Sequence, residues 1–115
     1  MLVTVQSAHQ TQIATLRRDG FVVVPNFLPG DALETLAGVP GPIGLVLLDG
    51  WKNLCLPVLR LLEPKLAPGA LVVADDITFT TMADYLAYVR DPASGYVSVT
   101  FPVEDGMEIS TWTGR

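Results

Sequence analysis

The chain has 115 residues, half of them apolar and 17% charged, with a formal net charge of −5. This length suits one domain, and the composition is that of a globular protein rather than a disordered one, so residues 1–115 are expected to form a single domain. The negative charge argues against a nucleic-acid surface, which needs clustered lysine and arginine. No apolar run approaches the roughly 20 residues of a membrane span. The single cysteine, Cys55, cannot form an internal disulfide, so a cytoplasmic protein is expected.

The first forty residues predict short elements separated by turns. Ile13 and Leu16 are spaced for one face of a short helix. The β-branched run 21–24 predicts a strand, because such side chains favour extended backbone. Asp31 can cap a brief helix that ends near Leu36.

The middle of the chain has a strand, helix, strand pattern. Residues 43–48 and 70–74 are almost wholly apolar, without the alternation of a strand that faces water. Such runs are typical of central strands in a parallel sheet, which are buried on both faces. Between them, apolar residues recur at helical spacing from Asn53 to Leu66, and Pro57 must lie in the first turn of that helix.

The last third predicts a helix and a hairpin. Residues 82–90 have the pattern of an amphipathic helix, whereas 96–103 and 107–112 alternate as antiparallel strands around an Asp105-Gly106 turn. The expected fold class is therefore α/β, with a mostly parallel sheet that ends in a C-terminal antiparallel hairpin.

Both central strands end in carboxylates. Asp49 follows the first strand, with Lys52 three residues later, and Asp75 and Asp76 follow the second strand. In open α/β sheets, ligands bind at the carboxyl ends of the parallel strands, so these side chains are expected to converge. Their convergence predicts a metal-assisted active site, because carboxylate oxygens bind divalent cations.

Simpler interpretations of the same residues remain open. Asp49 and Asp75 fit strand-end caps, and Asp76 fits an exposed turn. Lys52 fits a surface ion pair with Asp49, which is worth about 0–1 kcal/mol. Trp51 fits core or lid packing.

The same segments resemble class I S-adenosylmethionine-dependent O-methyltransferases of the catechol and caffeoyl-CoA group, over about residues 30–115. Residues 48–52, Leu-Asp-Gly-Trp-Lys, followed by Leu-Pro at 56–57, are similar to that family's Leu-Asp-x-Trp-Lys motif and helix start. Residues 73–77 resemble its second metal-binding strand, and 105–108 resemble its closing hairpin. The resemblance implies part of a Rossmann-like methyltransferase fold.

By this resemblance, the chain would transfer a methyl group from S-adenosylmethionine to a small hydroxylated acceptor. A lysine can take the acceptor's proton only if its surroundings depress its pKa. The implied site consists of metal ligands for Mg²⁺ or another divalent cation (Asp49, Asp75, Asp76), a general base (Lys52) and cofactor contacts (Asp31, Ala32, Asp49, Trp51). Asp76 stands where the family commonly has Asn, which adds negative charge.

One part of the family pattern is missing from residues 1–29, an atypical N-terminal segment before the methyltransferase-like core. The family has a Gly-rich turn after its first strand, whereas Gly20 is the only glycine before Gly30. A second hypothesis follows, namely a truncated, noncatalytic homologue that acts as a scaffold. Such a chain would expose an edge strand, 43–48, and form a homodimer through it, unless 21–24 fills that edge.

Overall fold

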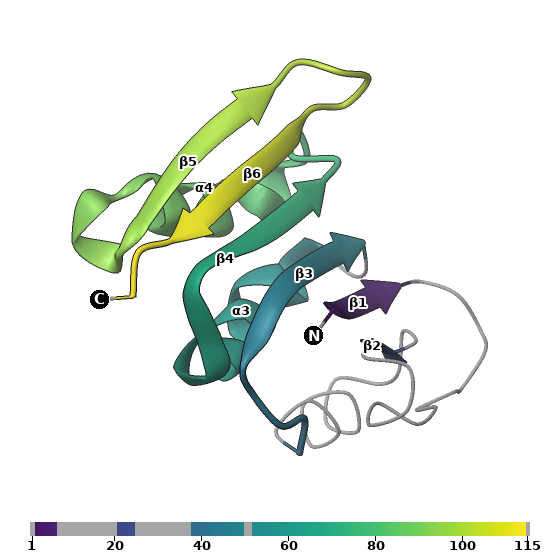
Figure 1. The fold of residues 1–115 in the computed structure, drawn as a ribbon. Helices are drawn as coiled ribbons and strands as arrows, with labels where there is room; N and C mark the ends of the chain where they lie inside the picture. Colours follow the sequence, from purple (N-terminus) through teal and green to yellow (C-terminus); the bar gives the residue numbers. More distant parts are fainter. Residues whose placement is uncertain (1, 7–20, 25–37, 50–51, 115) are drawn as a thin grey trace.

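The computed structural model describes residues 2–6, 21–24, 38–49 and 52–114 of the chain. Within this part, six strands form one sheet in the order β2-β1-β3-β4-β6-β5, and helices α3 and α4 lie together on one face of it (Figure 1). The helices expected around Ile13 and after Asp31 fall outside the described residues. The strands are β1 (Leu2–Gln6), β2 (Phe21–Val24), β3 (Ile43–Asp49), β4 (Leu66–Asp75), β5 (Tyr96–Phe101) and β6 (Met107–Trp112), and the helices are α3 (Cys55–Leu62) and α4 (Ala83–Arg90).

The sheet has a parallel part and an antiparallel part. β2, β1, β3 and β4 pair in parallel, whereas β6 runs antiparallel to both β4 and β5. The α/β class and the C-terminal hairpin are thus confirmed. The hairpin strand β5 ends at Phe101, before Pro102, which has no N–H to donate to a sheet.

The expectation that residues 43–48 lie at an open edge was wrong. β1 pairs with β3 along Leu2–Gln6 and separates it from β2, the strand predicted at 21–24. β1 was not predicted, because its five residues, Leu-Val-Thr-Val-Gln, give too short a pattern, and the pairing with β3 decides its structure.

Helix α3 is shorter than the predicted span from Asn53 to Leu66. A 3₁₀ turn, Lys52–Leu54, precedes it, and a second 3₁₀ turn, Glu63–Lys65, follows it. Pro64 lies in the second turn, where its ring and missing N–H prevent the α-helix from continuing. Two further 3₁₀ turns, Thr80–Met82 and Pro92–Ser94, flank α4.

The core lies between the sheet and the two helices. Side chains from alternate positions of β3 and β4 meet the inner faces of α3 and α4, and fully burying one such aliphatic side chain contributes about 1.5–3 kcal/mol. Cys55 is buried here, and so are Tyr85 and Tyr96. None of the described helices is both long and apolar enough to cross a membrane. Fully buried core residues include Val46, Leu59, Leu62, Val72, Ala74, Met82 and Val89.

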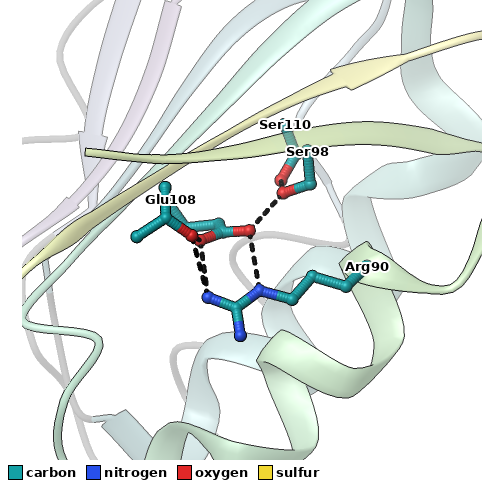
Figure 2. A network of polar contacts seen from close by, with 5 residues as sticks. Arg90, Ser98, Glu108 and Ser110 are labelled. Atoms are coloured by element: carbon teal, nitrogen blue, oxygen red, sulfur yellow. Dashed lines mark hydrogen bonds and ion pairs between the residues drawn. The ribbon is translucent and has the colours of Figure 1, made fainter. Parts of the chain in front are cut away.

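A buried carboxylate ties α4 to the hairpin (Figure 2). Glu108 of β6 is completely buried, and Arg90, the last residue of α4, donates to both of its oxygens, at 3.1 Å from Nε and 3.0 Å from Nη2. The hydroxyls of Ser98 and Thr100 donate to the same carboxylate at 2.6 Å. These four donors compensate for the loss of water around a buried charge.

The network also sets the protonation of Glu108. Burial by itself would raise the pKa of this carboxyl, but the hydrogen bonds from Arg90, Ser98 and Thr100 and the charge of Arg90 outweigh burial and lower the pKa. Because the pKa in the folded chain lies below that in the unfolded chain, the carboxylate stabilises the fold above the unfolded pKa. This contribution is lost as the pH falls through the folded pKa.

Replacing Glu108 by Gln is expected to lower the free energy of unfolding by about 1–3 kcal/mol at neutral pH, because the network loses its negative charge and one of its two acceptor oxygens. Urea denaturation at several pH values measures this loss, and the difference between the two proteins should shrink below about pH 4. Glu104→Gln is the control, since Glu104 is exposed. A difference that stayed constant down to low pH would contradict the assigned role of the charge.

Candidate active site

Two carboxylates stand at the carboxyl end of β4. Asp75 is the last residue of this strand, and its Oδ1 accepts a hydrogen bond from the backbone N–H of Asp76 at 2.9 Å. Asp76 has a positive φ of 54°, a left-handed conformation that Asp tolerates better than most residues because its short polar side chain bonds locally. The chain therefore turns sharply here and presents both acids at the carboxyl end of the parallel strands.

Lys52 reaches the same turn from the segment after β3. Its Nζ donates to the backbone carbonyl of Asp75 at 3.1 Å and lies 3.5 Å from Oδ2 of Asp76. The Lys52 side chain is 16% exposed and that of Asp76 is 34% exposed, so the pair is partly withdrawn from water. Three of the residues predicted for the site are thus brought together, and the partner found for Lys52 is Asp76.

Asp49 ends β3 beside the same turn. Leu48 pairs with Ala74, so Asp49 and Asp75 follow neighbouring positions at the same end of adjacent parallel strands. The side chain of Asp49 lies outside the described residues, as do Asp31, Ala32 and Trp51, the positions predicted to contact the adenine. Their roles stay predictions.

The oxygen atoms gathered at this turn are of the kind that bind a hard divalent cation. Asp75 and Asp76 offer carboxylate oxygens, the ligands that Mg²⁺ binds, and the end of β3 lies beside them. Among the described side chains, which exclude Asp49, there is no cluster of three or more metal-binding residues. Asp75 and Asp76 therefore lie at one turn beside the end of β3, and their assignment as metal ligands, with that of Asp49, stays a prediction.

The hairpin turn supports the turn that carries the acids. Ile77 N–H donates to the Gly106 carbonyl at 3.4 Å, and Thr78 N–H donates to the Asp105 carbonyl at 3.2 Å. Gly106 has a φ of 83°, and a Cβ at this position would lie only 2.7 Å from Cγ1 of Ile77. Asp105-Gly106 was predicted as a turn, but its contact with the backbone after Asp76 was not. The glycine at position 106 was the only local signal of that contact.

A groove opens beside Lys52. It has a volume of about 560 Å³ and runs between α3 and α4, with Arg60 on one wall and Thr81 and Asp84 on the other. This volume is in the range of small-molecule sites, roughly 300–1,000 Å³. A second hollow of about 160 Å³ lies at Asp75, between the ends of β3, β4 and β6. Small molecules can therefore reach Lys52 from the groove and Asp75 from the hollow.

Comparisons with known proteins find relatives among O-methyltransferases, although no family model matches. The chain is 38% identical over 79 residues to catechol O-methyltransferase B of Danio rerio, a match that covers 61% of this chain and 30% of that protein. In sequence, the chain thus resembles an O-methyltransferase enzyme, as its motifs predicted.

Solved structures show the same fold at low sequence identity. A Staphylococcus aureus protein provisionally assigned as a caffeoyl-CoA O-methyltransferase matches with a TM-score of 0.69 at 14% identity, over 96% of this chain and 75% of that one. A methyltransferase from Geobacter sulfurreducens matches with a TM-score of 0.60 at 16% identity, over 86% of this chain and 50% of that one. An O-methyltransferase from Bacillus cereus, in complex with SAH, matches with a TM-score of 0.55 at 13% identity, over 80% of this chain and 50% of that one. The described sheet is therefore Rossmann-like, and the chain spans only 30% to 75% of the lengths of these relatives.

Replacing Gly106 by Ala is expected to destabilise the chain more than replacing Gly69 by Ala. Both glycines have similar positive φ values, 83° and 85°, but a Cβ at Gly69 meets nothing within 4 Å. Gly69→Ala therefore measures left-handed strain alone, about 1–2 kcal/mol, and Gly106→Ala should lose a further 1–3 kcal/mol, roughly, from the collision with Ile77. Urea denaturation gives both values.

A double-mutant cycle with Ile77→Ala tests the assigned contact. Removing the Ile77 side chain should relieve part of the penalty at Gly106, which appears as a favourable coupling energy. Equal losses at Gly69 and Gly106, or additive effects of Gly106→Ala and Ile77→Ala, would contradict the close packing of Gly106 against Ile77.

Proposed function

Starting from the similarity to O-methyltransferases, we propose that this chain carries the metal and base side of an S-adenosylmethionine-dependent O-methyltransferase site. The acceptor in this proposal is a small hydroxylated molecule. The observation that carries the proposal is the position of Lys52, whose Nζ contacts the turn formed by Asp75 and Asp76. Because fold alone is compatible with many activities, this grouping of side chains is the stronger support.

Each group has a distinct chemical task in the proposed reaction. S-adenosylmethionine supplies a methyl group on a positively charged sulfur. A divalent cation such as Mg²⁺, held by Asp49, Asp75 and Asp76, would supply a positive charge that lowers the pKa of an acceptor hydroxyl. Lys52, in its neutral form, would take the hydroxyl proton onto Nζ as the oxygen bonds to the methyl carbon and the sulfur–methyl bond breaks, leaving S-adenosylhomocysteine. Such general-base help typically speeds a reaction roughly 10²- to 10⁴-fold.

The contacts of Lys52 hold its Nζ in position for this task. The Asp75 carbonyl and the Asp76 carboxylate fix Nζ at the carboxyl end of the sheet, next to the groove between α3 and α4. An acceptor in that groove would have its hydroxyl near Nζ without a change in the backbone. Geometry fixed in advance of binding is a large part of catalysis, because it removes the entropy cost of orienting the reactants.

The cofactor side of the proposal depends on four residues that the resemblance in sequence assigns to the cofactor. Asp31, Ala32 and Trp51 would contact the adenine, and Asp49 would lie near the amino end of the cofactor. The complex of the Bacillus cereus enzyme with SAH supports this class of ligand for the shared fold. We also propose a cytoplasmic location, which the single cysteine supports.

A noncatalytic homologue is the alternative function. The observation that favours it is the lack of a Gly-rich turn in residues 1–29, where Gly20 is the only glycine. A scaffold of this kind would fold normally and bind neither the cofactor nor its product. Ligand binding therefore separates the two functions.

S-adenosylhomocysteine titrated by calorimetry is expected to bind saturably with magnesium present and to bind at least about tenfold more weakly in chelator. Asp75→Asn should weaken the magnesium-dependent binding, because a ligand loses its charge. Asp91→Asn is the matched control, since Asp91 caps a distant turn and the amide oxygen can still accept from Ala93 N–H. A folded chain that binds equally well with chelator would exclude the assigned metal ligands, and one that binds nothing would favour the scaffold.

Replacing Lys52 by Met should reduce turnover with a catechol acceptor by about 10²- to 10⁴-fold while changing the affinity for S-adenosylhomocysteine less than threefold. Met has a similar length and retains the aliphatic packing, so the loss reports on Nζ. The split between turnover and binding is the decisive measurement. A variant that lost affinity and turnover in equal proportion would indicate that Lys52 only supports the structure of the site.

A further inference from the structure

β5 is an edge strand without the usual protection of an edge. Within the described residues it pairs only with β6, and it lies at the opposite end of the sheet from β2 (Figure 1). Its sequence, Tyr-Val-Ser-Val-Thr-Phe, contains no charged residue and no proline. Edge strands that stay unpaired usually have lysine, proline or a bulge, because their free N–H and C=O groups otherwise attract another strand.

The two faces of β5 differ in chemistry. Val97, Val99 and Phe101 are 62%, 54% and 45% exposed, and because side chains alternate along a strand they lie on the face opposite to Ser98 and Thr100. Ser98 and Thr100 point to the helix side, where their hydroxyls bond to Glu108. β5 therefore presents an apolar row on one side and a hydroxyl row on the other.

The order of residues in β5 makes this strand complementary to itself. When two copies run antiparallel with Val99 opposite Val99, Val97 of each copy meets Phe101 of the other, and Ser98 meets Thr100. Apolar side chains then lie opposite apolar ones, and hydroxyls lie opposite hydroxyls. Cross-strand pairs of both kinds stabilise antiparallel sheets, and no like charges face each other.

We infer that two copies of this chain form a homodimer by antiparallel pairing of β5 with β5 about a twofold axis at Val99. The pairing joins the two sheets into one and covers both free edges. Because a twofold axis closes the assembly after two copies, it produces no filament. The inference goes beyond the proposed function and corrects the predicted dimer edge from residues 43–48, which β1 covers, to β5.

The apolar surface continues inward from this edge. Val97 and Leu71 both pair with Thr111 of β6, from opposite sides, and Leu71 is 41% exposed. The surface that pairing of one six-residue strand buries on each copy is nevertheless smaller than the roughly 800 Å² that each partner contributes to a standard stable interface. The expected dimer is therefore weak and dependent on concentration. Since each chain has a net charge of −5, added salt should strengthen the association by screening.

Sedimentation equilibrium from micromolar to submillimolar protein tests the dimer. The unmodified chain should pass from monomer to dimer over this range, and Val99→Lys should raise the dissociation constant at least about tenfold, because two ammonium groups would meet at the axis. Ala87→Lys, on the exposed side of α4, is the control with the same charge change. Leu71→Lys distinguishes pairing at the β5 edge from packing between the open faces of two sheets. If the faces packed together, Leu71→Lys would weaken the dimer more than Val99→Lys.

Cysteine cross-linking tests the register independently of Val99→Lys. Cys55 is buried, so a cysteine introduced at the edge is the accessible thiol. Val99→Cys should form a disulfide-linked dimer at least about tenfold faster than Val97→Cys, because only residue 99 lies opposite its own copy, within disulfide reach. A chain that remains monomeric at submillimolar concentration, or that cross-links equally fast at both positions, would overturn the inference.

Discussion

The parallel pairing of β3 with β4 determines where the candidate catalytic groups lie. Leu48 stands beside Ala74, so the chain leaves both strands at the same end of the sheet, and Asp49 and Asp75 follow directly. Lys52, three residues after Asp49 in the sequence, contacts the Asp75 carbonyl. Both strands are covered by α3 and α4, and a shift of one residue in their register would turn every buried side chain to the opposite face. The hydrophobic core thus fixes the geometry of the polar site.

Two sets of contacts join the C-terminal hairpin to the rest of the fold. Arg90 and Glu108 join α4 to β6, and Gly106 joins the hairpin turn to the backbone after Asp76. A buried ion pair is not stabilising by default, because removing charges from water is costly. Here Arg90 remains 46% exposed on its side chain, and four donors surround Glu108, so the cost of burial is reduced. The acid turn is consequently supported from both the strand and the hairpin.

The sheet separates two kinds of surface. Its carboxyl end holds Lys52 and the acids, which support the proposed methyl transfer, whereas the edge at β5 is uncharged and apolar on one side. Association through β5 would leave the lysine and the groove beside α3 open, because they lie at other parts of the fold. The proposed enzyme site and the proposed dimer are therefore compatible and depend on different residues.

The sequence by itself determined the central strands, both described helices, the hairpin and the end of β4 where Asp75 and Asp76 stand, since these follow from local patterns of apolar, turn and acidic residues. It did not determine β1, whose five residues carry too weak a pattern, nor the early end of α3 at Leu62. Only the tertiary structure decided that β1 covers β3, that Lys52 contacts Asp76 and that Gly106 meets Ile77. The physical reason is that local patterns report which side chains avoid water, whereas contacts between distant residues depend on how the strands pair.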